Sequence, residues 1–117
     1  MLTIIAGSRT IHDYELLKTA ISLSGYKITG VVCGEASGVD SLGKRYAKEK
    51  NIPIHSYPAD WERYGKKAGY IRNQQMVDIA SQCLILYDGS SKGTKITIDL
   101  WNKKHGTNNL FILYLSK

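Results

Sequence analysis

Short apolar runs alternate along the chain with longer segments in which apolar side chains return every three or four residues. The apolar runs cover residues 2–6, 28–33, 52–57, 83–87 and 110–115. Short runs that are largely apolar, without a polar residue at every second position, are typical of strands covered on both faces of a sheet. The pattern therefore predicts five buried β-strands.

The segments between these runs have the spacing of amphipathic helices. Asp13 stands where its side chain can cap the first helix, and the second helix is expected to end near Asn51, before Pro53. The fourth is expected to end near Gly106. The side chains expected to face the core are Leu16, Leu17, Ala20, Ile21 and Leu23 in the first helix, Val39, Leu42, Tyr46 and Ala47 in the second, Ala68, Ile71, Gln75, Met76 and Ile79 in the third, and Ile96, Leu100 and Trp101 in the fourth.

Strands that alternate with helices of this length form repeated βαβ units, which build a parallel sheet with helices on both faces. We therefore expect an α/β fold, a Rossmann-like three-layer sandwich whose five-stranded parallel sheet has the strand order 3-2-1-4-5. The length suits one hydrophobic core, so residues 1–117 are expected to form a single domain. Ligands of such sheets bind beyond the carboxyl ends of the strands, where the strand order reverses.

Composition narrows the class of protein. No apolar run approaches the roughly 18 residues that a membrane span needs, and residues 1–6 lack a basic leader, so we expect a cytoplasmic protein without a membrane partner. Cys33 and Cys83 adjoin apolar runs and are expected to be buried free thiols. The three histidines are far apart in the sequence and match no metal spacing, so neither a metal nor a cofactor is expected.

The formal net charge of +6 is compatible with a nucleic acid, with a phosphate-bearing small ligand, or with a lysine-rich solvated surface. The lysines are scattered over several segments and form no run of five or more, which favours a solvated surface over a nucleic-acid interface. An excess of positive charge would still steer a phosphate-bearing ligand toward the protein.

Polar loops with glycines follow three of the predicted strands. Gly7, Ser8 and Arg9 offer a close backbone approach, a hydroxyl and a guanidinium, although alone they are equally compatible with a tight turn. Gly93 and Thr94 can bind a phosphate with their backbone amides. No loop has the G-x-G-x-x-G spacing or the residue order of a P-loop, so a dinucleotide oxidoreductase and a nucleoside triphosphatase are not favoured.

The loop after the second predicted strand leads directly into a helix, where exposed amides and the helix dipole favour an anion. Asp40 can cap this helix or accept a hydrogen bond from a ribose hydroxyl, and capping is the commoner role. The candidate ligand-binding residues of this loop are Gly34, Glu35, Ala36, Ser37, Gly38 and Asp40.

The connection over residues 58–76 crowds aromatic, basic and amide side chains between two glycines. Trp61 and Tyr64 can stack on a base or close the core beneath the loop. Arg72, followed by Asn73, starts a helical face that continues with Met76 one turn later, so it is the first candidate for binding an anion near the sheet edge. A connection of this composition suits an anionic and partly aromatic ligand such as a nucleotide.

Taken together, these motifs resemble the SLOG superfamily, which includes the cytokinin-activating LOG enzymes and the DNA-processing protein A family. They are most similar to its YspA-like, YpsA-related branch, common in bacteria and their phages. That branch reads Gly-Ser-Arg, Gly-Gly-Ala-x-Gly-x-Asp, Pro-Ala-Asp-Trp…Tyr-Gly-x-x-Ala-Gly…Arg-Asn-x-x-Met and Gly-Thr, matched here at residues 7–9, 34–40, 58–76 and 93–94. The resemblance implies a nucleotide or nucleotide-derivative site, commonly at an oligomer interface. Glu35 replaces the usual second glycine, which implies that a phosphate is crowded or repelled there.

The hydrolytic LOG relatives cleave the N-glycosidic bond of a nucleoside monophosphate with an arginine and a glutamate. Arg72 matches that arginine, but Thr97 stands at the position of the glutamate. Glycosidic cleavage needs a carboxylate to stabilise positive charge on the sugar or to activate water, and threonine supplies neither. The resemblance therefore implies binding rather than cleavage, with Asp60 or Glu62 as the carboxylates that could act with Arg72 if the protein is an enzyme.

Three hypotheses follow from the sequence. The first is a homo-oligomeric protein that senses or sequesters a nucleotide-derived signal, ADP-ribose-like ligands included, in phage–host conflict. Its ligand would contact the residues named in the three loops together with Asp60, Trp61, Tyr64, Arg72 and Asn73. The second is a LOG-like N-glycosidase, or phosphoribohydrolase. The third is a DNA-binding module, which comes last because the chain is small and has no basic stripe.

Overall fold

The computed structural model describes residues 1–35 and 37–115. In chain order the elements are β1 (Leu2–Gly7), α1 (Tyr14–Ser24), β2 (Gly30–Cys33), α2 (Val39–Lys50), β3 (Ile54–Ser56), α3 (Trp61–Tyr64), the 3₁₀ helix η1 (Gly65–Lys67), α4 (Ala68–Ile79), β4 (Gln82–Tyr87), α5 (Lys92–His105) and β5 (Leu110–Tyr114).

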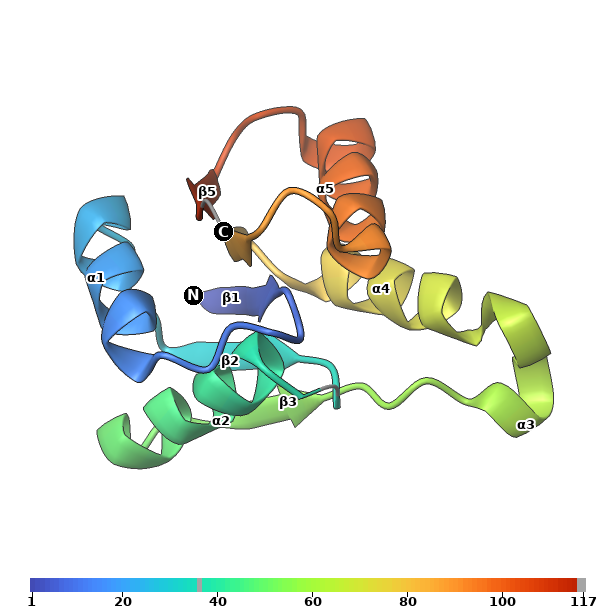
Figure 1. Cartoon of the computed structure of the whole chain (residues 1–117), viewed down its shortest axis with the longest axis horizontal. Coiled ribbons are helices and arrows are strands. Elements are labelled where there is room, and N and C mark those ends of the chain that lie inside the picture. Colours follow the sequence, from blue (N-terminus) through green and yellow to red (C-terminus); the bar gives the residue numbers. More distant parts are fainter. Residues whose placement is uncertain (36, 116–117) are drawn as a thin grey trace.

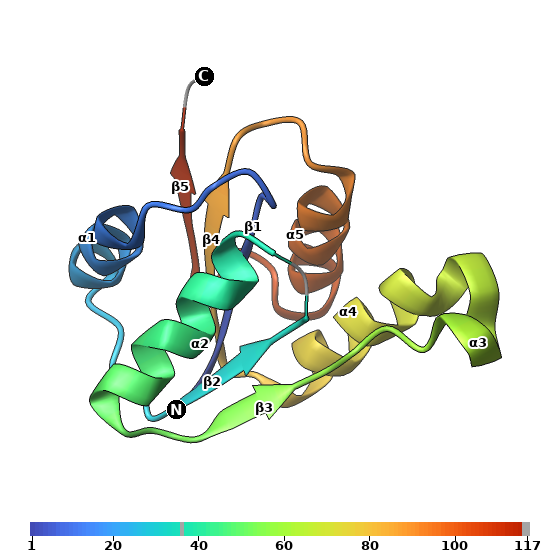
Figure 2. The same cartoon turned by 60° about the horizontal axis from the view of Figure 1, so that its bottom comes forward.

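The strands form one parallel sheet with the order β3-β2-β1-β4-β5 (Figures 1 and 2). In the central strand, Ile4 is level with Val32 of β2 on one side and with Cys83 of β4 on the other. The expected Rossmann-like arrangement and its strand order are thus confirmed. The order reverses between β2 and β4, on either side of β1, so any site at the switch point lies beyond the end of β1.

Helices cover both faces of the sheet, α1 and α2 on one face and α4 and α5 on the other (Figure 1). Successive residues of β1 enter different cores. Ile5 packs in the cluster that contains Leu17 of α1 and Ala47 of α2, whereas Ile4 packs in the cluster of Met76 and Trp101. Because each face of β1 is buried, its sequence is apolar without alternation.

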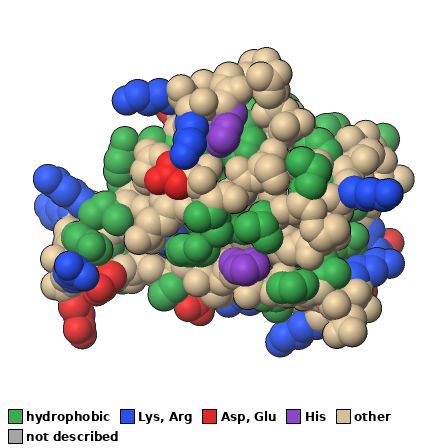
Figure 3. All heavy atoms as spheres, turned by 180° about the vertical axis from the view of Figure 1, so that it is seen from behind, with side chains coloured by type: hydrophobic (Ala, Val, Ile, Leu, Met, Phe, Trp, Pro, Cys, Tyr) green, Lys and Arg blue, Asp and Glu red, His purple; other side chains and the backbone are tan. Residues whose placement is uncertain are grey.

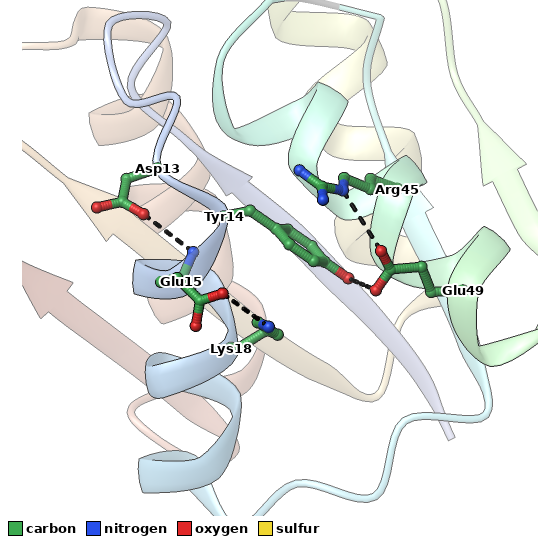
Figure 4. A network of polar contacts seen from close by, with 6 residues as sticks. All are labelled: Asp13, Tyr14, Glu15, Lys18, Arg45 and Glu49. Carbon is green, nitrogen blue, oxygen red and sulfur yellow. Dashed lines mark hydrogen bonds and ion pairs between the residues drawn. The ribbon is translucent and has the colours of Figure 1, made fainter.

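A network of polar contacts joins α1 to α2 on the first face (Figure 4). The Tyr14 hydroxyl donates to a carboxylate oxygen of Glu49 at 2.6 Å, and the Arg45 guanidinium lies 4.1 Å from the centre of the Tyr14 ring. Arg45 also pairs with Glu49 at 3.4 Å. Asp13 caps α1 as expected, accepting a hydrogen bond from the Glu15 backbone N–H. This network fixes the start of α1 against the second half of α2.

The stripe of α4 that faces the core differs from the expectation. Ala68 and Met76 are buried as expected, but Gln75 and Ile79 are exposed, and Asn73 and Val77 are buried in their place. Leu23 of α1 is also exposed. The reason for the α4 difference is that α4 packs on α5, with Met76 and Val77 in the same core cluster as Trp101.

Residues 57–67 lead away from the sheet before the chain returns in α4, and α3 lies at the far end of this excursion (Figures 1 and 2). We call residues 57–67 the arm. Trp61 and Tyr64 are 58% and 37% exposed, so neither closes the core beneath the loop. The thiols of Cys33 and Cys83 are buried and free, as expected. Within the described residues, no helix is long and apolar enough to cross a lipid bilayer.

Candidate functional site

A hollow of about 300 Å³ lies beyond the carboxyl end of β1, between the first turns of α2 and α5 and the side of α4. We call it the central hollow. Its lining residues are Ala6, Gly7, Arg9, Asp40, Arg72, Asn73, Met76, Ser91, Lys92, Gly93, Thr94 and Thr97. The structure therefore brings together seven of the residues expected at a ligand site, from four segments of the sequence: Gly7, Arg9, Asp40, Arg72, Asn73, Gly93 and Thr94.

Arg72 reaches this edge from α4 and is held by two hydrogen bonds. Its Nε–H donates to the side-chain oxygen of Asn73 at 2.8 Å, and its Nη1 donates to the Tyr57 carbonyl at 3.4 Å. Asn73 is 5% exposed and donates in turn to the Gly93 carbonyl of α5. The guanidinium is thus aimed by α4, the start of the arm and α5 together, although it remains partly exposed.

Gly34 lies between the side chains of Arg72 and Asp40. A Cβ on Gly34 would overlap Nη1 of Arg72 and lie 2.8 Å from Oδ2 of Asp40. Real Cβ atoms essentially never approach other atoms so closely. The absence of a side chain at Gly34 therefore leaves room for the ends of the Arg72 and Asp40 side chains beside it, and Asp40, in the first turn of α2, is 7% exposed.

Gly38 packs the second loop onto the first instead of lining the central hollow. Its φ of 75° is in the region that favours glycine, and a Cβ there would lie 2.5 Å from the carbonyl oxygens of Ser8 and Arg9. The Val39 N–H donates to the Ser8 carbonyl at 3.4 Å. Contact between these backbones sets where Arg9 and Asp40 stand relative to each other.

Ser8 is 1% exposed, and its hydroxyl accepts a hydrogen bond from the Asp88 N–H at 3.1 Å. It therefore supports the loop after β4 rather than lining the central hollow. Asp88 organises that loop by accepting from the backbone N–H groups of Ser90 and Ser91, at 2.9 and 3.1 Å. The bond from the Ser90 N–H is the largest cause that lowers the pKa of Asp88 to about 2.

The first turn of α5 forms another wall of the central hollow. Ser91 caps the helix by accepting from the backbone N–H of Thr94, and it also accepts from the Thr94 hydroxyl at 2.9 Å. Lys92 and Gly93 are exposed, and a Cβ on Gly93 would meet nothing within 4 Å. A helix N-terminus of this kind favours an anion through its free amides and its dipole.

Thr97 occupies the position where the resemblance would place a catalytic glutamate. It lines the central hollow, is 2% exposed, and donates its hydroxyl to the Gly93 carbonyl at 3.2 Å. Thr97 therefore brings no charge to the central hollow, and its hydroxyl is hydrogen-bonded within α5.

Several residues expected at the site lie elsewhere. Asp60 caps α3 by accepting from the Arg63 N–H at 3.2 Å, and it lines a separate hollow of about 260 Å³ with Tyr64 and Arg72. Glu62 and Ser37 are exposed and line neither hollow, and Ala36 lies outside the described residues. A third hollow, of about 200 Å³, contains Glu35 and Trp61. Asp60, Trp61 and Glu62 do not line the central hollow because the arm carries residues 58–67 away from the edge of the sheet.

Sequence reasoning did not single out five residues of the central hollow as ligand contacts: Ala6, Met76, Ser91, Lys92 and Thr97. Ser91 and Lys92 stand directly before Gly93, so their place in the same loop was a usable signal. Ala6 and Met76 line the hollow because β1 and α4 end beside it, and apolar residues of this kind carry no local signal of their own. Among the described residues there is no cluster of His, Cys, Asp and Glu that could hold a metal ion.

The parallel sheet, its strand order and the hollow at its switch point define a Rossmann-like α/β protein. A sequence model described as the YspA, cpYpsA-related SLOG family matches residues 1–64. The chain is similar to the Gene 61 protein of Mycobacterium phage D29, with 36% identity over 102 residues that cover 79% of this chain and 81% of the relative. No solved structure matches. The chain belongs to the YspA, cpYpsA-related SLOG family, and membership suggests nucleotide-related ligand binding.

Proposed function

We propose that this protein binds a nucleotide or nucleotide-derived ligand in the central hollow and does not cleave it. The observation that carries this proposal is the convergence of Arg9, Arg72 and Lys92 with the N-terminus of α5 around one hollow in which Thr97 replaces the expected glutamate. The phosphates of an ADP-ribose-like molecule are groups that this hollow could bind.

Phosphate groups account for most of the proposed contacts. The guanidinium of Arg72 is pre-positioned by Asn73, and planar guanidinium groups bind phosphate through two parallel hydrogen bonds. The Gly93 amide at the start of α5 adds a donor, whereas the Thr94 amide is occupied by the Ser91 cap. Asp40 can accept hydrogen bonds from the ribose hydroxyls beside Arg72. The volume, about 300 Å³, is at the lower end of the range for small-molecule sites.

The alternative function, cleavage of an N-glycosidic bond, has a specific observation in its favour. Asp40 is a carboxylate that lines the central hollow together with Arg72, whereas Asp60 and Glu62 do not line it. A glycosidase mechanism in this protein would therefore use Asp40, and we favour binding because Asp40 reaches the hollow from α2 and not from the α5 position that the LOG enzymes use.

The DNA-binding alternative receives less support. On the face opposite that of Figure 1, Lys and Arg side chains lie scattered around the margin and hydrophobic side chains occupy the centre (Figure 3). Proteins that bind DNA non-specifically place basic side chains along a continuous stripe.

The relative from a phage supports a role in phage–host conflict, in which the protein would act in the cytoplasm of a bacterial cell. We propose that it acts there as a homo-oligomer, whose size light scattering after gel filtration would measure.

The proposed function is tested by ligand identification and by one pair of variants. Mass spectrometry of the native purified protein should detect an intact nucleotide, and Arg72→Ala should lose it. Arg45→Ala is the matched control, because Arg45 lies on α2 in the network with Tyr14 and outside the central hollow. Release of free base from nucleoside monophosphates, abolished by Asp40→Asn, would overturn the non-catalytic proposal. Retention of the same nucleotide by Arg72→Ala would show that the central hollow is not the site.

A further inference from the structure

The third hollow, which contains Glu35 and Trp61, adjoins the central one at the base of the arm. It has a volume of about 200 Å³ and is lined by Arg9, Glu35, Pro58, Ala59, Trp61 and Arg72. We call it the Trp61 hollow. Arg9 and Arg72 line both hollows, so a ligand that extends from one to the other passes these two arginines. The two hollows together offer room for a ligand with two chemically different ends.

The charges of the two hollows differ, which sets the direction of such a ligand. Each hollow contains one carboxylate, Asp40 in the central hollow and Glu35 in the Trp61 hollow, but only the central hollow also has Lys92 and the N-terminus of α5. Glu35 is 49% exposed and is paired with Lys44 at 3.4 Å. A phosphate would be repelled by this carboxylate and attracted by the amides of α5. The phosphate end of a nucleotide therefore lies toward α5, and its base lies toward the arm.

Trp61 supplies a surface for that base. The ring lies near the first turn of α4, since a Cβ on Gly69 would be 3.6 Å from its Cη2 atom, yet 58% of the residue is exposed. An exposed tryptophan at the wall of a polar hollow offers a face on which a base can stack, and stacking tolerates any base because each has a π-face. Stacking on Trp61 therefore gives affinity without choosing the base.

Selectivity among the bases would come from Glu35. An ionised carboxylate only accepts hydrogen bonds, and its two oxygens match two parallel donors. Guanine presents such a pair, the N1–H and the N2 amino group, on one edge. Adenine presents one amino group beside an acceptor nitrogen, which faces a carboxylate unfavourably. We propose that the Trp61 hollow receives the base of the bound nucleotide and that Glu35 makes it selective for guanine. This inference rests on the proposed nucleotide-binding function.

The test compares guanosine, inosine and adenosine diphosphates by isothermal titration calorimetry. Inosine lacks only the N2 amino group of guanine, so it isolates one of the two hydrogen bonds. For the unmodified protein we expect guanosine diphosphate to bind about fivefold or more tightly than inosine diphosphate, and adenosine diphosphate to bind most weakly. Glu35→Gln should bring the guanosine and inosine ligands to within about twofold of each other.

Two further variants separate base selection from folding and from stacking. Glu15→Gln removes an exposed carboxylate that is likewise paired with a lysine, Lys18, but lies on α1, and it should leave the guanosine preference unchanged. Trp61→Leu should weaken all three ligands by a similar factor. Thermal unfolding of every variant verifies that each is folded.

The outcomes distinguish this inference from the proposal on which it rests. Equal affinity for the guanosine and adenosine ligands, or a guanosine preference that survives Glu35→Gln, would refute base selection by Glu35. If either outcome is found and Arg72→Ala nonetheless loses nucleotide binding, the nucleotide-binding function stands. If the unmodified protein binds none of the three nucleotides, the inference fails, and mass spectrometry of the native purified protein decides the proposed function separately.

Discussion

Arg72 donates its Nε–H to the side-chain oxygen of Asn73 at 2.8 Å, so the residue that follows the arginine in α4 aims its guanidinium. Asn73 is 5% exposed, and it also donates to the Gly93 carbonyl at 3.4 Å. The buried amide therefore connects the candidate anion-binding arginine with the first turn of α5. Residues that position a charged group in this way affect binding without touching the ligand's charge themselves.

Replacing Asn73 by alanine is expected to raise the dissociation constant for the nucleotide about five- to tenfold, which corresponds to a loss of about 1 kcal/mol of binding free energy. The variant keeps all the basic side chains of the central hollow but frees the guanidinium to rotate. Titration calorimetry measures the affinity. Gln74→Ala is the matched control, because the Gln74 side chain donates to Asp78 within α4 and does not line the central hollow, so this variant should bind as the unmodified protein does. Equal losses in the two variants would contradict the positioning role.

Replacing Gly34 by alanine is expected to impair ligand binding more than it impairs folding. The new Cβ would displace the end of the Arg72 side chain and press on Asp40, and the tip of a long side chain can move at little cost. The melting temperature should change by a few degrees at most, about what 1 kcal/mol produces in a domain of this size, while affinity falls by about tenfold or more. Gly69→Ala provides the comparison, since its Cβ would meet only Trp61 at an ordinary 3.6 Å. Undiminished affinity in Gly34→Ala would show that Arg72 does not act from this place.

Acid should destabilise the loop after β4 through Asp88. Its ordinary pKa is 3.8, and hydrogen bonds, first of all from the Ser90 N–H, lower the pKa of Asp88 to about 2 in the folded protein. A lowered pKa means that the ionised form stabilises the fold fully above about pH 4 and that this stabilisation is lost as the pH falls toward 2. Urea unfolding between pH 5 and pH 2 should therefore show a steeper loss of stability for the unmodified protein than for Asp88→Asn. If the free energy of unfolding falls equally steeply with pH in both proteins, Asp88 does not cause the acid destabilisation.

Tyr14→Phe should lower the free energy of unfolding at neutral pH by about 1 kcal/mol, because it removes the hydrogen bond to the half-exposed Glu49 carboxylate. Tyr114→Phe, at an exposed tyrosine, should have no effect. Burial and the bond to Glu49 raise the pKa of Tyr14 from 10.0 to about 12, so the stabilisation present below pH 10 is lost between pH 10 and pH 12. A pH series of urea unfolding should show that Tyr14→Phe lacks this alkaline component, and an identical alkaline loss in both proteins would refute the assignment.

Sequence reasoning succeeded best where both faces of an element are buried. The runs around Ile4 and Leu84 are apolar throughout because each strand faces two cores, so their position and parallel pairing were predictable. The pattern was less informative for β3, which spans Ile54–Ser56 and leaves His55 exposed at the edge of the sheet. It placed Ala68 and Met76 of α4 correctly but Gln75 and Ile79 wrongly, because a spacing of three to four residues fits more than one face of a helix and only the packing against α5 chooses among them.

The sequence by itself determined the order of strands and helices, the loops at the carboxyl edge of the sheet, and Arg72 as the leading candidate for anion binding. These follow from local periodicity, glycine placement and the rule that parallel strands end at one edge. Only the tertiary structure decided which carboxylate stands beside Arg72. Asp60 and Glu62 are nearer to it in sequence, but Asp60 shares a separate hollow with Arg72 and Glu62 lines neither hollow, whereas Asp40 shares the central hollow with it. Arg72 and Asp40 come from helices packed on opposite faces of the sheet, and no local pattern encodes where two such helices converge.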